Sequence, residues 1–169
     1  MKLLNITIYG FGRFSNYIYD FNQPITVIDK PNSYGKTTIA QFIKAMFYGL
    51  GRASTRTVDK PREKYNPWGG GQFGGELTFS RNTNKYTIIR TFGAGAADDE
   101  FKLFDQQRNI YLDKFNGQTI DDKGRQFGEI LFGISEESFE KINFIQQLKV
   151  LYFDADQTLH SDINTRLRE

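Results

Sequence analysis

Apolar and polar positions change period along the first half of the chain and predict two strands, a third strand and then a helix. Residues 3–9 are rich in apolar and β-branched side chains and end at a glycine, which predicts a strand with residues 17–21 as its hairpin partner. Residues 25–28 (Ile-Thr-Val-Ile) are too apolar for a surface strand and predict a buried one. From Thr37 to Leu50, apolar residues recur at spacings of three and four, which predicts an amphipathic helix.

The second half alternates between short strands and polar turns. Residues 52–72 contain basic side chains, prolines and three consecutive glycines, and they predict an exposed loop. Two antiparallel hairpins are then predicted, from residues 75–80 with 85–91 and from residues 101–104 with 109–112, with residues 93–100 as a turn between them.

Helical patterns follow these hairpins. Residues 123–131 predict a helix, and Ser135 can cap the next helix, with Glu136 and Glu137 in its favourable first turn. We expect one domain over residues 1–155, and the start of a helix leading to a coiled coil over residues 156–169.

A glycine-lysine loop lies between the predicted strand at 25–28 and the helix after it. Residues 29–38 read Asp-Lys-Pro-Asn-Ser-Tyr-Gly-Lys-Thr-Thr. In the pattern G-x-x-x-x-G-K-[ST], backbone N–H groups wrap phosphates, the lysine reaches the terminal phosphates and the hydroxyl holds magnesium. Gly35, Lys36 and Thr37 match the last three positions, and Thr38 adds a second hydroxyl. Strand, loop and helix together predict a nucleotide-binding α/β fold.

Lys30 stands where the pattern has its first glycine. That glycine ordinarily permits a tight turn close to the phosphates, and Lys30 precedes a proline, which favours extended conformations. The sequence leaves two outcomes open: Lys30 weakens phosphate binding, or its ammonium itself approaches phosphate.

Composition excludes several other kinds of site. The 22 basic and 20 acidic side chains leave a net charge of +2, which favours neither binding nor exclusion of nucleic acid. The chain has no cysteine and one histidine, which argues against a disulfide scaffold, a thiol nucleophile or a zinc site and fits a reducing cytoplasm. No apolar run approaches the ~18 residues of a membrane span, so we expect a cytoplasmic protein without a membrane partner.

The loop and its flanks resemble the N-terminal head region of SbcC/SMC-type ABC ATPases, and most of all the YhaN-like bacterial group. Further similarity covers residues 65–68, 73–77, 86–92, 131–134 and 139–147, and therefore nearly the whole chain. The family loop reads Gly-Pro-Asn-Glu-Ala-Gly-Lys-Ser, so Lys30, Ser33 and Tyr34 are departures from it. The resemblance implies the N-terminal lobe of a P-loop NTPase head, with a central sheet, a P-loop helix and antiparallel hairpins.

By this resemblance the chain binds ATP and Mg²⁺. The residues implied in nucleotide binding are Asn32, Gly35, Lys36, Thr37, Thr38 and, from the first hairpin, Arg13. Thr37 and the Q-loop glutamine, placed at Gln147 rather than Gln146, are implied as metal ligands, since an amide oxygen suits a hard cation.

The implied partners are the C-terminal lobe of the same head, a second head, a nuclease subunit and DNA, in DNA repair or DNA end processing. No catalytic residue is assigned within this chain. Alone it should hydrolyse ATP poorly, because the family's Walker B and signature segments belong to that other lobe.

Two segments imitate missing motifs. Residues 69–72 (Gly-Gly-Gly-Gln) look like the signature of ABC ATPases, but they precede a hairpin rather than open a helix. Residues 150–154 end in Asp154 like a Walker B strand, but Ala155 follows where a glutamate would activate water.

Other interpretations remain. The five basic and two acidic side chains of residues 52–64 form either a solvated loop or a nucleotide- or DNA-facing one. The whole chain could instead be a small kinase or GTPase that uses Asp154, or a non-enzymatic interaction module with a degenerate loop.

Overall fold

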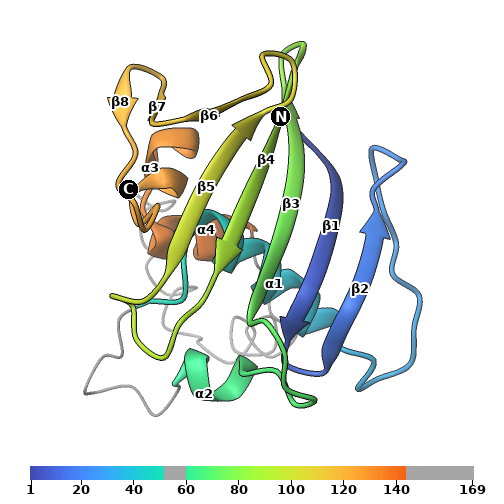
Figure 1. The fold of residues 1–169 in the computed structure, drawn as a ribbon. Coiled ribbons are helices and arrows are strands. Elements are labelled where there is room, and N and C mark those ends of the chain that lie inside the picture. The colour runs from blue at the N-terminus through green and yellow to red at the C-terminus, as the bar shows by residue number, and fades with distance from the viewer. Residues whose placement is uncertain (52–59, 144–169) are drawn as a thin grey trace, which may run out of the picture. The chain divides into compact units, whose positions relative to one another are not determined.

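Six strands form one antiparallel sheet in the computed structural model, which describes residues 1–51 and 60–143 (Figure 1). The strands lie in the order β2-β1-β3-β4-β5-β6, and each neighbouring pair is antiparallel. Their bounds are Lys2–Phe11 (β1), Phe14–Asp20 (β2), Gly74–Arg81 (β3), Asn84–Thr91 (β4), Glu100–Asp105 (β5) and Ile110–Leu112 (β6). The fold is therefore α/β, and all neighbouring strands of this sheet are antiparallel.

One face of the sheet forms the apolar core. A single row of cross-strand neighbours crosses all six strands, through Tyr19, Ile6, Leu77, Ile88, Leu103 and Leu112. Its four central members are at most 1% exposed. Side chains on adjacent strands that share a face pack directly, and this packing is what fixes the register of the sheet.

Helix α1 (Lys36–Tyr48) covers this face and packs against β1, β3, β4 and the short helix α3 (Phe127–Phe132) (Figure 1). Its buried positions follow the predicted helical spacing, with Ile39, Phe42 and Met46 each at most 1% exposed. Burying such a side chain contributes about 1.5–3 kcal/mol, so the apolar face of α1 fixes where its N-terminal end lies. The predicted helix is confirmed, with Gly49 as its C-cap.

The predicted strands are confirmed for three hairpins. β1 pairs with β2, β3 with β4 through a two-residue loop, and β5 with β6. β2 begins three residues earlier than the pattern predicted, at Phe14, because Phe14 pairs with Phe11 across the Gly12-Arg13 turn.

The predicted buried strand at residues 25–28 is wrong. These residues form no strand, and Ile25 and Val27 are 82% and 78% exposed. An apolar segment forms a buried strand only where a neighbouring strand pairs with its backbone and another layer covers its side chains. Among the described strands β2 is the edge of the sheet, and residues 25–28 do not pair with it. The run precedes the glycine-lysine loop as expected, but in an open position.

The predicted exposed loop at 52–72 is partly wrong, since Pro61–Tyr65 form helix α2 and Tyr65 is 8% exposed. Pro61 stands in the first turn of α2, where a missing N–H costs nothing.

The predicted helix at 123–131 starts later, at Phe127. Lys123 and Gly124 instead present their carbonyl oxygens to Arg90, and Gly124 has a φ of 57°, which a helix excludes.

Two elements near the end of the described chain complete the picture. β7 (Lys114–Phe115) and β8 (Gln118–Thr119) form a small hairpin that the pattern did not predict, around Asn116 and Gly117, both with positive φ.

The chain divides into two compact units, Met1–Gly133 and Ile134–Glu169. In the second unit α4 (Glu136–Asn143) has the predicted cap, since the backbone N–H of Ser138 donates to Ser135 Oγ at 3.3 Å.

Candidate functional site

The glycine-lysine loop forms a compact turn that leads directly into α1. The backbone N–H of Tyr34 donates to the Pro31 carbonyl oxygen at 3.2 Å, and Ser33 has a φ of 68°. Gly35 follows as the N-cap of α1, with a φ of 110°. Positive φ values interspersed among ordinary ones turn successive backbone N–H groups toward one side, which is the geometry of an anion-binding nest.

The N-terminal end of α1 leaves backbone donors open. Ile39 is the first residue with an intrahelical bond, to the Gly35 carbonyl oxygen at 2.9 Å. The N–H groups of Lys36, Thr37 and Thr38 precede that bond, and no side chain caps them. The first turn contains no acidic residue, so nothing in it neutralises the positive end of the helix dipole. Such an end attracts anions.

Lys36 closes the loop. Its ammonium donates to the carbonyl oxygen of Lys30, six residues earlier in the chain, at 2.6 Å. This places an exposed cation beside the open N–H groups, where it destabilises the helix through the dipole unless an anion is bound. The position of Lys36 is therefore unfavourable for helix stability and puts a cation beside the uncapped N–H groups.

Lys30 fits the loop without backbone strain. Positive φ occurs at five non-glycine positions in the described part of the chain, and Lys30 is not one of them. The backbone here does not need a glycine, and the Lys30 ammonium lies 5.7 Å from the centre of the Tyr34 ring. The backbone at Lys30 therefore does not adopt the positive φ that would favour a glycine, and both outcomes for phosphate binding stay open.

The loop rests on the turn between β1 and β2. Gly35 passes so close to the Phe14 ring that a Cβ atom on it would lie 2.6 Å from that ring. The Arg13 guanidinium donates to the carbonyl oxygen of Ser33, and a Cβ on Gly12 would lie 3.2 Å from Thr38 Cγ2. The glycine of the loop is thus required twice, by its φ and by the ring beneath it.

Tyr17 of β2 lies beside the loop and contacts Tyr34 within it. The hydroxyls of Tyr17 and Tyr34 lie 3.5 Å apart, and both rings pack near Phe14. Burial, and after it the hydrogen bond with the Tyr34 hydroxyl, together raise the pKa of Tyr17 to about 12. Tyr17 therefore stays uncharged at neutral pH and does not repel an anion.

The predicted site residues are partly brought together. Residues 32 and 35–38 belong to one loop, and Arg13 contacts it from the β1–β2 turn. Asn32, Lys36 and Thr37 are exposed, and the Thr38 methyl group faces Gly12. Gln147 and Asp154 lie outside the described residues, as do residues 52–59 of the basic loop. The described residues contain no cluster of three or more His, Cys, Asp or Glu, so a metal here would depend on a hydroxyl and on the ligand's own oxygens.

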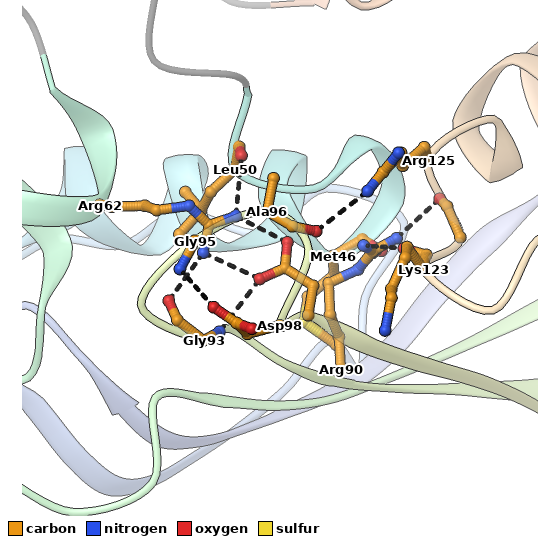
Figure 2. A network of polar contacts seen from close by, with 12 residues as sticks. Met46, Leu50, Arg62, Arg90, Gly93, Gly95, Ala96, Asp98, Lys123 and Arg125 are labelled. Atoms are coloured by element: carbon orange, nitrogen blue, oxygen red, sulfur yellow. Dashed lines mark hydrogen bonds and ion pairs between the residues drawn. The ribbon is translucent and has the colours of Figure 1, made fainter.

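A second polar centre, which the sequence did not predict, lies at the other end of α1 (Figure 2). Arg90 is 1% exposed and donates to the carbonyl oxygens of Met46 (3.2 Å), Lys123 (2.9 Å) and Gly124 (2.9 Å). Burial lowers its pKa to about 10, so it remains charged at neutral pH. The alternation in β4 was the available signal, since Arg90 is two residues from buried Ile88 and shares its face.

Arg62 joins this centre from α2. It forms a two-pronged ion pair with Asp99, with distances of 2.7 and 2.8 Å, and donates to the Gly93 and Leu50 carbonyl oxygens at 2.9 and 3.3 Å. One cation of the basic segment is therefore engaged within the protein. Lys60 forms a surface pair with Glu63 at 2.7 Å.

Within residues 1–51 and 60–143, no helix has both the length and the apolar content needed to cross a bilayer.

Comparison with known proteins identifies the family of this chain. The AAA domain family matches residues 5–169. The "uncharacterized protein YhaN" of Bacillus subtilis (strain 168) is 36% identical over 78 residues, which are 46% of this chain and 7% of that protein. This chain thus corresponds to a small part of its relative's length. The chain belongs to the AAA domain family of P-loop NTPases, and its sequence is that of a YhaN-like, SbcC/SMC-type N-terminal region.

Proposed function

We propose that this chain binds ATP with Mg²⁺ through residues 30–38, as the N-terminal lobe of an SbcC/SMC-like ATPase head. The observation that carries the proposal is the N-terminal end of α1, where three uncapped N–H groups lie beside the Lys36 ammonium and no acidic side chain opposes them. A helix end with this charge arrangement favours a bound phosphate.

Different residues of the loop would bind the phosphates and the metal. The N–H groups from Gly35 to Thr38 and the Lys36 ammonium would hold phosphate oxygens, and the exposed Thr37 hydroxyl would hold the metal. Bound ATP would supply the phosphoanhydride bond that the intact head cleaves. Gln147 is proposed as a further metal ligand on the resemblance alone.

The exposed apolar residues before the glycine-lysine loop indicate a surface for a partner domain. Ile25 and Val27 are β-branched, apolar and largely exposed, next to an edge strand, β2, that has no neighbour on its outer side among the described strands. Exposed apolar side chains beside an open sheet edge are typical of a surface that another element covers. We propose that the C-terminal lobe of the head adds strands here and supplies the residues that activate water.

The wider role is proposed by family resemblance: DNA repair or DNA end processing, with head–head pairing and a nuclease subunit. These rest on the family and not on a contact within this chain.

Calorimetry with ATP and Mg²⁺ tests the core of the proposal. Lys36→Ala should weaken ATP binding by about tenfold or more, because a charge-assisted hydrogen bond contributes about 1.5–3 kcal/mol. Lys85→Ala, which removes an exposed lysine from β4, is the matched control and should bind ATP like the wild type.

The melting temperature of Lys36→Ala should stay close to that of the wild type, since the one described contact of this ammonium is with Lys30. Absence of heat with the wild-type chain, or equal affinity in Lys36→Ala, would count against ATP binding and favour an interaction module.

A further inference from the structure

The turn between β1 and β2 links the glycine-lysine loop to a distant part of the chain. On one side, Arg13 donates to the Ser33 carbonyl oxygen, and Phe14 lies under Gly35. On the other side, both backbone polar groups of Gly12 are bound by residues 65–68. The Gly12 N–H donates to the Tyr65 carbonyl oxygen at 2.7 Å, and the Trp68 N–H donates to the Gly12 carbonyl oxygen at 2.9 Å.

The backbone that carries Arg13 is therefore fixed. Gly12 has a φ of 56°, which favours glycine, and its two hydrogen bonds leave it little freedom to rotate. Stacking of the Tyr65 ring on Phe11, with centroids 4.8 Å apart, holds the segment that accepts and donates these bonds. Arg13 thus extends from a rigid turn toward a loop that contains a strained residue.

The strained residue is Ser33, whose φ of 68° is uncommon for a residue with a side chain. Its carbonyl oxygen accepts from Arg13, and the N–H of the next residue, Tyr34, donates to Pro31 at 3.2 Å. In a trans peptide the C=O and N–H point in opposite directions. Holding the Ser33 carbonyl outward therefore holds the Tyr34 N–H inward, within the loop.

We infer that Arg13 is a positioning residue, which keeps the Ser33 carbonyl dipole turned away from the phosphate-binding side of the loop. This inference rests on the proposed function of the loop but assigns Arg13 a different part in it. The guanidinium acts on the loop backbone and not on the nucleotide. Rotation of the 33–34 peptide would turn a carbonyl oxygen toward the phosphates and repel them.

Three arginine variants test this role without the need for a nucleotide. Arg13→Met keeps the length of the side chain and removes the donor, while Arg13→Lys keeps a donor. Arg125→Met is the matched control, because Arg125 is also exposed and donates to a carbonyl oxygen, that of Ala96, at 3.2 Å.

Amide hydrogen exchange, measured by NMR on the full chain, is the first readout. Arg13→Met should accelerate exchange of the Tyr34 N–H by about tenfold, since the opening of that bond becomes easier. Arg13→Lys should restore most of the protection, and Arg125→Met should leave it unchanged. Unaltered Tyr34 exchange in Arg13→Met overturns the inference.

Calorimetry with ATP and Mg²⁺ is the second readout. If the wild type binds ATP, Arg13→Met should weaken binding by about tenfold, and Arg13→Lys should restore it to within about threefold. Weaker binding with unaltered Tyr34 exchange would mean that Arg13 contacts the nucleotide directly, and it overturns the positioning role.

Normal ATP binding by Arg13→Met also overturns the inference but leaves the proposed function intact. No binding by the wild type defeats the proposed function, and the exchange measurement then still decides whether Arg13 positions the loop.

Discussion

The two ends of α1 are built in opposite ways. At the C-terminal end, Arg90 and Arg62 donate to the carbonyl oxygens of Met46 and Leu50, so cations inside the protein satisfy the negative end of the helix. At the N-terminal end, backbone donors are uncapped, and Lys36 adds a charge of the wrong sign for helix stability.

Under the proposed function, this difference separates stability from nucleotide binding within one helix. At the end around Arg90, the polar groups are buried and hydrogen-bonded, whereas the end around Lys36 is exposed and its backbone N–H groups have no side-chain cap. Substitutions at the first end should therefore lower the free energy of unfolding, and those at the second should act mainly on nucleotide binding.

The largest effect is expected at the buried end. Arg90→Met should lower the free energy of unfolding by about 3–5 kcal/mol, because the carbonyl oxygens of Met46, Lys123 and Gly124 lose their donor in a buried place. Urea denaturation measures this change. Arg125→Met, at an exposed position, should change stability by less than about 0.5 kcal/mol. A loss of under about 1 kcal/mol in Arg90→Met would remove the basis for the comparison.

An intermediate effect is expected at the exposed end. Gly35→Ala should cost about 2–3 kcal/mol of stability and weaken ATP binding by at least about tenfold, since it combines an unfavourable φ with a collision against the Phe14 ring. Gly133→Ala is the matched control, because Gly133 has a φ of 73° with nothing within 4 Å of an added Cβ.

Gly133→Ala should show only the conformational cost, about 1 kcal/mol, with unchanged ATP affinity. Equal effects of the two substitutions on urea denaturation and calorimetry would mean that the Phe14 contact contributes nothing.

The smallest effect concerns Tyr17, beside the loop. Its pKa is raised from 10 to about 12, so its protonated form contributes stability that is fully present below pH 10 and is lost as the pH rises toward 12. Over that range, Tyr17→Phe should lose less stability than the wild type in urea denaturation.

Tyr9→Phe provides the matched comparison, because burial and Glu76 likewise raise the pKa of Tyr9 to about 12 on a different part of the sheet. It should show the same dependence on pH without any effect on ATP affinity. Parallel pH curves for the wild type and both variants would contradict the role given to these hydroxyls.

The periodicity of apolar residues predicted those elements whose contacts are between residues close together in the sequence. The hairpins at β1–β2, β3–β4 and β5–β6 were predictable because neighbouring strands pair through short turns, and α1 because its apolar spacing matches a face that is buried. The loop at 29–38 was recognisable because the residues that match the pattern, Gly35, Lys36 and Thr37, are consecutive in the sequence.

Residues 25–28 and Arg90 show where pattern failed. Residues 25–28 were predicted to be buried because they are apolar, and no buried role was predicted for Arg90. Ile25 and Val27 are exposed since no described strand pairs with them, and Arg90 is buried since three carbonyl oxygens from two distant segments converge on it.

The sequence by itself determined the periodicity of the strands and of α1 and the identity of the glycine-lysine loop. The tertiary structure decided that Gly35 lies on Phe14, that Arg13 donates to Ser33, and that the backbone at Lys30 has no positive φ where the pattern has glycine. The physical reason is that these outcomes depend on the distance between groups remote in sequence and on backbone angles set by tertiary packing, and no local pattern encodes either.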